Sequence, residues 1–217
     1  GTTWVDAFNF LQDGLAAAVA GDVVKVANGE YRPDQSTANP DGTLDPTATF
    51  QLINGVTVIG GFLGNTVDAT CCLTPDPDTY KLNTCCCCLV TAPVEAPCAC
   101  DAPCGSCCGK TVLTGVVDPN ISYHVVTGSG TDATAVLENV TITGGNANGV
   151  NPNHKGGGMI NNAGSPTLKY VCFEANSAKD AGGAMYNTNG SSPALMSCSF
   201  CGNSAEWGGA VANYDWS

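Results

Sequence analysis

The side chains of this sequence with the most reactive chemistry are thiols, and most of them lie in one stretch. Residues 71–108 hold eleven of the fourteen cysteines in the chain: Cys71, Cys72, Cys85, Cys86, Cys87, Cys88, Cys98, Cys100, Cys104, Cys107 and Cys108. Thiols at this density either pair as disulfides or bind a metal as thiolates. Two of the spacings, C-x-C and C-x-x-C, suit metal ligands, but no histidine lies nearby and no paired C-x-x-C frame forms. We therefore expect disulfides formed in an oxidising compartment, with a metal cluster as the alternative.

Carboxylates and basic side chains offer little for catalysis. Hydrolysis of a glycosidic bond needs two carboxylates about 5–10 Å apart, but no Asp-Asp pair falls on an expected strand and the acids expected on the faces of the repeat are sparse: Glu138, Glu174 and Glu206. The single arginine, Arg32, lies in a Tyr-Arg-Pro turn. The two histidines, His124 and His154, have no nucleophile at a recognisable spacing and are expected on surface loops. We expect no enzymatic activity, no cofactor and no bound metal.

The acids of the N-terminal part are concentrated in a loop. Residues 31–49 are rich in Pro, Asp, Asn and Thr, which predicts a lateral loop. Its acids (Asp34, Asp41 and Asp45) are spaced unlike any compact calcium loop. We interpret them as solvated carboxylates.

Charge and hydropathy exclude several classes of partner. The net charge of −12, from 19 acidic and 7 basic residues, disfavours nucleic acid and anionic membrane surfaces. No apolar run is long enough to cross a bilayer, so no membrane insertion is expected. Gly1 is interpreted as the first residue of a processed chain. With the cysteine content, these features predict a secreted protein, located extracellularly or at a cell surface.

The element that must position these groups is an internal repeat. A step of 27 residues relates Pro166 to Pro193, Leu168 to Leu195, Phe173 to Phe200 and Asn176 to Asn203. A step of 26 residues relates the glycine pairs at 156–157, 182–183 and 208–209, and it also relates Met159, Met185 and Val211. A fixed period of this size indicates stacked units that cannot bury an apolar face alone.

Short strands account for the repeat better than helices do. Brief alternating apolar runs are interrupted by Ser-Pro, Asn-Ser and Gly-Gly, which predicts two or three strands per turn. Stacked turns lie about 4.8 Å apart, so residues one step apart form ladders. We expect inward ladders from Leu168 to Leu195 and from Phe173 to Phe200, and a corner ladder from Asn176 to Asn203. The fold class is therefore all-β, a right-handed parallel β-helix.

The same register places the three remaining cysteines. Cys198 falls on the inward face beside Val171, whereas Cys172 and Cys201 fall on the outward face. Diagonal neighbours on a sheet are about 7–8 Å apart, near or beyond disulfide reach. At least one outward thiol is therefore expected to bond the cysteine-rich insertion or another subunit.

Two sequence motifs of the repeat resemble those of a known group of proteins. Phe173-x-x-Asn176 is followed by Gly182-Gly-Ala-Met185, and Phe200-x-x-Asn203 is followed by Gly208-Gly-Ala-Val211. This pattern resembles the repeats of chlamydial polymorphic outer-membrane adhesins and of secreted bacterial right-handed parallel β-helix repeat proteins. The resemblance extends over the chain except for roughly residues 71–108. It implies the fold and suggests an adhesin or glycan-binding role.

We expect one domain over residues 1–217. Thr3-x-x-Asp6, followed by apolar residues at helical spacing, predicts an N-terminal capping helix over 3–20. The first turns follow at 23–70, the disulfide-stapled insertion at 71–108 and the regular turns at 109–217.

Two functions fit this organisation. An uncapped last turn would leave unpaired strand edges, which are a template for another chain. The first hypothesis is therefore a structural protein that associates with itself head to tail into a filament or surface fibre, through an end formed by Trp207, Tyr214 and Trp216. The alternative is an adhesin or glycan-binding module of a bacterial surface protein, for which the candidate exposed aromatic residues are Tyr186, Trp207, Tyr214 and Trp216. A polysaccharide-degrading enzyme is the least favoured hypothesis.

Overall fold

The computed structural model describes residues 3–62, 64, 111–117 and 120–214. The predictions for the cysteine-rich insertion and for Trp216 lie outside the described residues. In sequence, the insertion falls between strands β4 (Thr57–Phe62) and β5 (Thr111–Thr114).

Most of the described strands form three parallel sheets of five strands each. The first sheet contains β1 (Val23–Ala27), β4, β9 (Val136–Glu138), β13 (Thr167–Lys169) and β17 (Ala194–Met196). The second contains β2 (Gly29–Tyr31), β5, β10 (Thr141–Thr143), β14 (Cys172–Glu174) and β18 (Ser199–Cys201). The third contains β3 (Phe50–Gln51), β8 (Val126–Thr127), β12 (Met159–Asn162), β16 (Met185–Thr188) and β19 (Val211–Tyr214).

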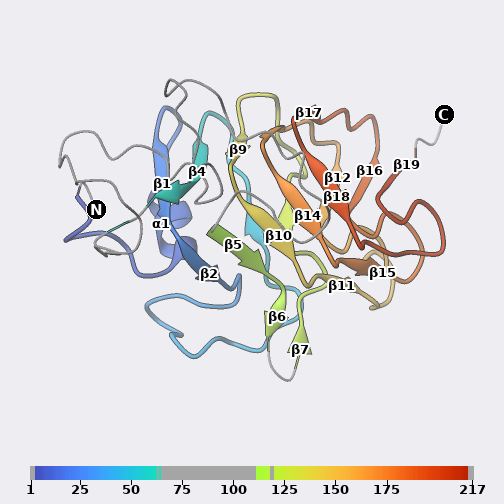
Figure 1. The fold of residues 1–217 in the computed structure, drawn as a ribbon, viewed down its shortest axis with the longest axis horizontal. Helices are drawn as coiled ribbons and strands as arrows, with labels where there is room; N and C mark the ends of the chain where they lie inside the picture. The colour runs from blue at the N-terminus through green and yellow to red at the C-terminus, as the bar shows by residue number, and fades with distance from the viewer. Residues whose placement is uncertain (1–2, 63, 65–110, 118–119, 215–217) are drawn as a thin grey trace, which may run out of the picture.

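Each sheet adds its strands in chain order, so the chain advances by one strand in every sheet per pass. We call one pass through the three sheets a coil. The coils stack along the long axis of the molecule, from the N-terminal end on the left to the C-terminal end on the right (Figure 1). Two short pairs complete the strands: parallel β11 (Asn146–Ala147) with β15 (Ser177–Ala178), and antiparallel β6 (Val116–Val117) with β7 (Asn120–Ile121). This arrangement is compatible with the predicted β-solenoid.

The repeat steps of the sequence appear as strand register. Leu168 pairs with Leu195, and Phe173 pairs with Ile142 on one side and with Phe200 on the other. The rings of Phe173 and Phe200 are stacked, with centroids 5.0 Å apart and planes 5° from parallel. Leu168 and Phe173 are completely buried. A buried side chain of this size contributes about 1.5–3 kcal/mol, so these ladders form the core.

The N-terminal helix is shorter than predicted. α1 spans only Leu11–Ala17, whereas a helix over 3–20 was expected. The predicted capping contact does form, because the Thr3 amide donates to Asp6 Oδ1 at 2.7 Å, but it closes an isolated turn instead of starting a helix. Seven residues that include Gly14 are too few to be stable alone, so buried Leu11 and Leu15 hold the helix against the first coil. Among the described residues, no helix is long and apolar enough to cross a membrane.

Candidate functional site

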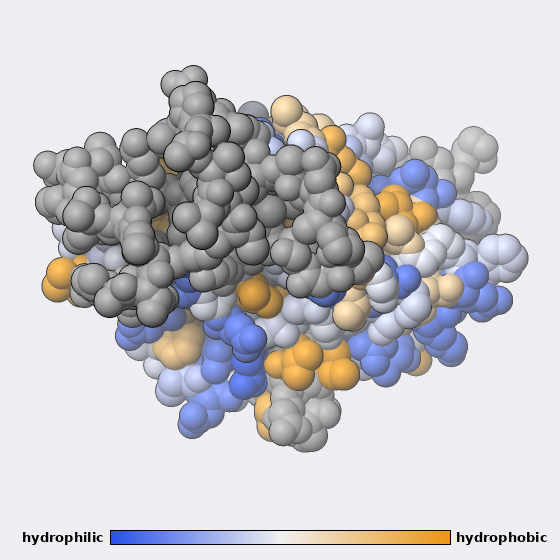
Figure 2. Space-filling view, viewed as in Figure 1, coloured by the Kyte–Doolittle hydropathy of each residue, from blue (hydrophilic) through white to orange (hydrophobic). Residues whose placement is uncertain are grey.

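The last described coil exposes a side chain of the ladder that is buried at Val58, Leu137 and Leu168 in the three coils before it. β17, β18 and β19 are edge strands among the described residues. Leu195 is 41% exposed and Met196 54% exposed, whereas Leu168, one coil earlier, is fully buried. Figure 2 shows hydrophobic surface on the C-terminal half of the visible face. We call the side chains of this last coil that continue the core (Leu195, Phe200 and Val211), together with Met196, the end face.

The opposite end of the stack also carries exposed apolar side chains. Phe8, Val19 and Val23 are all at least half exposed around α1 and β1. The two alanines at the end of α1, Ala16 and Ala17, are exposed as well. Both ends of the molecule therefore offer apolar surface.

A column of buried asparagines runs through the third sheet to its edge strand. Asn161 donates through Nδ2 to Oδ1 of Asn187 at 2.8 Å, and Asn187 donates in the same way to Asn213 at 2.8 Å. Asn161 is fully buried and Asn213 is exposed. The hydrogen-bonded amides therefore connect the interior to the end of the stack.

Replacing Asn187 with alanine is expected to lower the free energy of unfolding by about 2 kcal/mol, because the buried Asn161 amide loses its acceptor. Asn213→Ala is the matched control, since water can satisfy the group that it leaves unpaired, and its cost is expected to be a few tenths of a kcal/mol. Urea denaturation followed by circular dichroism measures both. Equal losses for the two variants would contradict a role for the buried hydrogen bond.

The predicted corner ladder is a second amide pair. Asn176 is fully buried and donates through Nδ2 to Oδ1 of Asn203 at 3.0 Å and to the Ile142 carbonyl at 2.9 Å. Its own Oδ1 accepts from the Gly145 amide at 3.0 Å. This side chain therefore ties three coils together at the corner.

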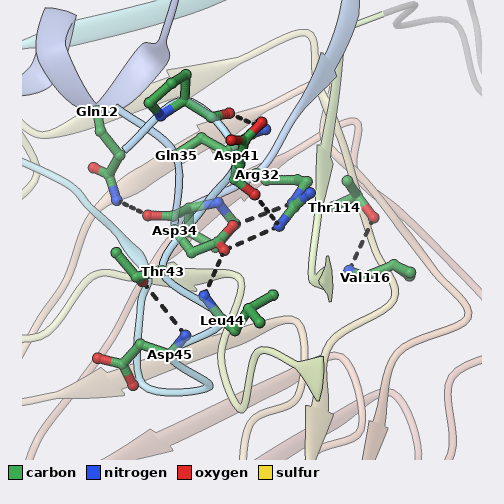
Figure 3. A network of polar contacts seen from close by, with 12 residues as sticks. Gln12, Arg32, Asp34, Gln35, Asp41, Thr43, Leu44, Asp45, Thr114 and Val116 are labelled. Atoms are coloured by element: carbon green, nitrogen blue, oxygen red, sulfur yellow. Dashed lines mark hydrogen bonds and ion pairs between the residues drawn. The ribbon is translucent and has the colours of Figure 1, made fainter. Parts of the chain in front are cut away.

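The N-terminal loop contains a buried ion pair instead of only solvated acids (Figure 3). The Asp34 carboxylate is completely buried, accepts from Arg32 Nε at 3.2 Å and Nη2 at 3.0 Å, and also accepts from the Leu44 amide at 3.1 Å. The interpretation of Asp34 as solvated was therefore wrong. A buried carboxylate requires a partner. The Arg32 side chain is that partner, and the ion pair helps to close this loop.

The remaining loop acids stay at the surface. Asp41 and Asp45 are both exposed. Hydrogen bonds from the backbone amide and the hydroxyl of Thr47 hold the pKa of Asp45 below its usual value. These hydrogen bonds close a local turn. They do not bring Asp45 together with another carboxylate.

The two histidines have different environments. His124 is buried, contrary to the surface position expected from the sequence, and its Nδ1 lies 2.8 Å from the Gly156 carbonyl oxygen. Burial lowers the pKa of His124, so the ring is held neutral. His154 is partly buried and its Nε2 lies 3.1 Å from Asp180 Oδ2. Both imidazole rings therefore lie next to a polar group of the protein.

Two described aromatic residues were assigned to the self-association end, and one of them lies beside Lys155. Trp207 is 68% exposed and Tyr214 46% exposed. The Lys155 ammonium lies 5.1 Å from the ring centroid of Tyr186 and 5.6 Å from that of Tyr214. Tyr186, expected from the sequence to be an exposed aromatic residue, is buried. Lys155 was not assigned to a site from the sequence.

The three cysteines of the regular coils occupy the predicted register. Cys172 pairs with Ser199, and Cys201 pairs with Glu174. Cys198 lies just before β18, with its Sγ 3.5 Å from the Leu168 carbonyl oxygen. Cys172 is buried, whereas Cys201 and Cys198 are partly buried.

Comparison with known proteins identified no relative of this chain. No family model, curated protein or solved structure matches the chain.

Proposed function

We propose that this chain is an extracellular structural protein, a right-handed parallel β-helix that associates with itself end to end. The observation that carries the proposal is the end face, where a buried core ladder reaches the surface at Leu195 and the neighbouring Met196 is also exposed. Exposed apolar ladders beside unpaired strand edges are unfavourable in water and bind another molecule readily.

The two ends of the stack are built from different elements, but both expose apolar side chains. Head-to-tail contact is therefore favoured. The N-terminal end presents α1 and exposed Phe8 and Val19, whereas the C-terminal end presents strand edges. Contact between unlike surfaces does not close on itself and builds a filament. Since a helix lies at one of the two ends, we expect side-chain packing to dominate over the addition of strands.

The proposed extracellular location rests on the cysteine content of the chain, fourteen residues in all. Cys172 and Cys201 are proposed to form disulfides. Disulfides persist in oxidising compartments and are rare in the cytosol. The eleven cysteines of the insertion are proposed to staple that segment in the same way.

Replacing Leu195 with glutamate is expected to weaken self-association at least about tenfold, because contact at the end face would bury a carboxylate without a partner. Sedimentation velocity over a concentration series measures the assembly, and electron microscopy shows whether filaments form. Val150→Glu is the matched control, since Val150 is an exposed aliphatic residue of a loop outside the end face. Monomeric wild-type protein at every concentration would overturn the proposal, as would a Leu195→Glu variant that assembles normally.

A further inference from the structure

A second surface lies on the outward side of the third sheet, away from the end face. In β16, Met185 is fully buried in the core and Asn187 belongs to the asparagine column, so alternation places Tyr186 and Thr188 on the other side of the strand, where Tyr186 is itself buried. Tyr214 pairs with Thr188 in register and therefore also points outward. We call Lys155, Tyr186, Trp207 and Tyr214 the aromatic flank.

Trp207 joins this flank through the stacking of the coils. Parallel bridges pair Lys155 with Ala181, and Ala181 with Trp207, so the three residues form one ladder. The Trp207 side chain is the most exposed large aromatic group among the described residues. A tryptophan combines a large apolar surface with a polar N–H group, which suits contact with a partner that has both characters.

Polar groups surround these rings. The Lys155 ammonium lies over both tyrosine rings and 3.5 Å from the Tyr186 hydroxyl. Asp180, which pairs with His154 at 3.1 Å, is joined to Trp207 through its backbone carbonyl, which accepts from the Trp207 amide at 2.8 Å. The flank therefore presents two exposed aromatic rings, those of Trp207 and Tyr214, and the Lys155 ammonium lies beside the Tyr214 ring.

We propose that the aromatic flank binds neutral glycans. A pyranose ring has an apolar face of C–H groups that can lie on Trp207, and its hydroxyls both donate and accept hydrogen bonds, as Lys155 and Asp180 require. The other partner classes fit poorly. A fully apolar partner would desolvate those charges without pairing them, and the net charge of −12 repels polyanions.

The rings of the flank also limit which glycans bind. The flank has one described cation close to its rings, and the two tyrosine rings already stabilise it. The partly exposed carboxylate of Asp180 belongs to the residue whose backbone carbonyl accepts from the Trp207 amide, and exposed Glu206 directly precedes Trp207 in the chain. These carboxylates oppose sugars that carry uronate or sialate groups, so neutral hexose and N-acetylhexosamine chains are the preferred class.

This site is independent of the proposed self-association. Its residues lie on the side of the stack, whereas the end face is formed by Leu195, Met196 and the inward ladders. A glycan on the flank would leave the end face uncovered. Loss of one activity therefore need not remove the other.

The test uses the full chain on a panel of immobilised neutral β-linked hexose and N-acetylhexosamine oligosaccharides, with uronate oligosaccharides beside them. We expect the wild type to be retained by neutral members of the panel, and Trp207→Ala to reduce its affinity at least about tenfold. Trp207→Phe retains a ring for stacking and should recover part of that loss. Val116→Ala is the control, because it removes an exposed apolar side chain that belongs neither to the flank nor to the surfaces proposed for self-association.

Circular dichroism spectra that match the wild type would show that the variants fold. Binding of no glycan, or of uronate chains alone, would overturn the proposal. So would a Trp207→Ala variant that binds as well as the wild type. Leu195→Glu should bind glycans normally, which separates this site from self-association.

Discussion

Replacing Phe173 with alanine is expected to lower the free energy of unfolding by about 4 kcal/mol. The ring is fully buried and stacked between Ile142 and Phe200 in neighbouring coils. Its removal would leave a cavity in the middle of the stack, where coils on both sides fix the surrounding backbone. Urea denaturation followed by circular dichroism should show a large fall in the transition midpoint.

Phe200→Ala supplies the matched comparison, because it makes the same chemical change one coil later. Phe200 is only partly buried, so its replacement is expected to cost about 2 kcal/mol. Both variants should be measured below the concentration at which the protein associates, since contact at the end face would also cover Phe200. Equal losses would mean that the last coil is covered in the monomer, contrary to the end face described above.

Ladders were the part of the fold that could be predicted from the sequence. Phe173 and Phe200 are one repeat step apart, and a stack of parallel strands places such residues on top of each other. The same reasoning applies to one ladder that contributes to the aromatic flank. Lys155, Ala181 and Trp207 are also separated by steps of 26 residues, so their ladder was readable from the sequence, although it was not recognised.

Contacts that do not follow the repeat step could not be predicted in the same way. The burial of Asp34 depends on how its loop folds over the first coils, and Arg32, two residues away, was the one available signal. The burial of His124 depends on the Gly156 carbonyl, 32 residues away. The length of α1 was overestimated because a capping contact can form around a single turn without a helix behind it.

The two proposed activities use different consequences of one architecture. Stacking of the coils buries inward-pointing side chains such as Leu168 and Phe173 between their neighbours. In the last described coil the ladder has no described neighbour on one side, and Leu195 reaches the surface. Stacking also aligns outward residues along the side of the molecule, so Lys155 and Trp207 share one surface although they are far apart in sequence. A filament built through the ends would repeat the flank along its length.

Replacing Gly183 with alanine is expected to lower the free energy of unfolding by at least about 3 kcal/mol. A Cβ atom at this position would overlap the backbone carbonyl oxygens of Gly209 and Ser204 in the next coil. Backbone atoms cannot turn away as the end of a side chain can, so the coils would have to separate. The glycine pairs of the repeat are therefore required by the close approach of adjacent coils at this corner.

Gly130→Ala separates this steric effect from the conformational freedom of glycine. Gly130 has a φ of +71°, and nothing lies within 4 Å of its added Cβ, whereas Gly183 has no positive φ. The strain of alanine in the left-handed region is expected to cost about 1 kcal/mol, much less than the overlap at Gly183. Urea denaturation of the two variants measures the difference. If Gly183→Ala were as stable as Gly130→Ala, the coils would not be packed as closely at this corner as the structure places them.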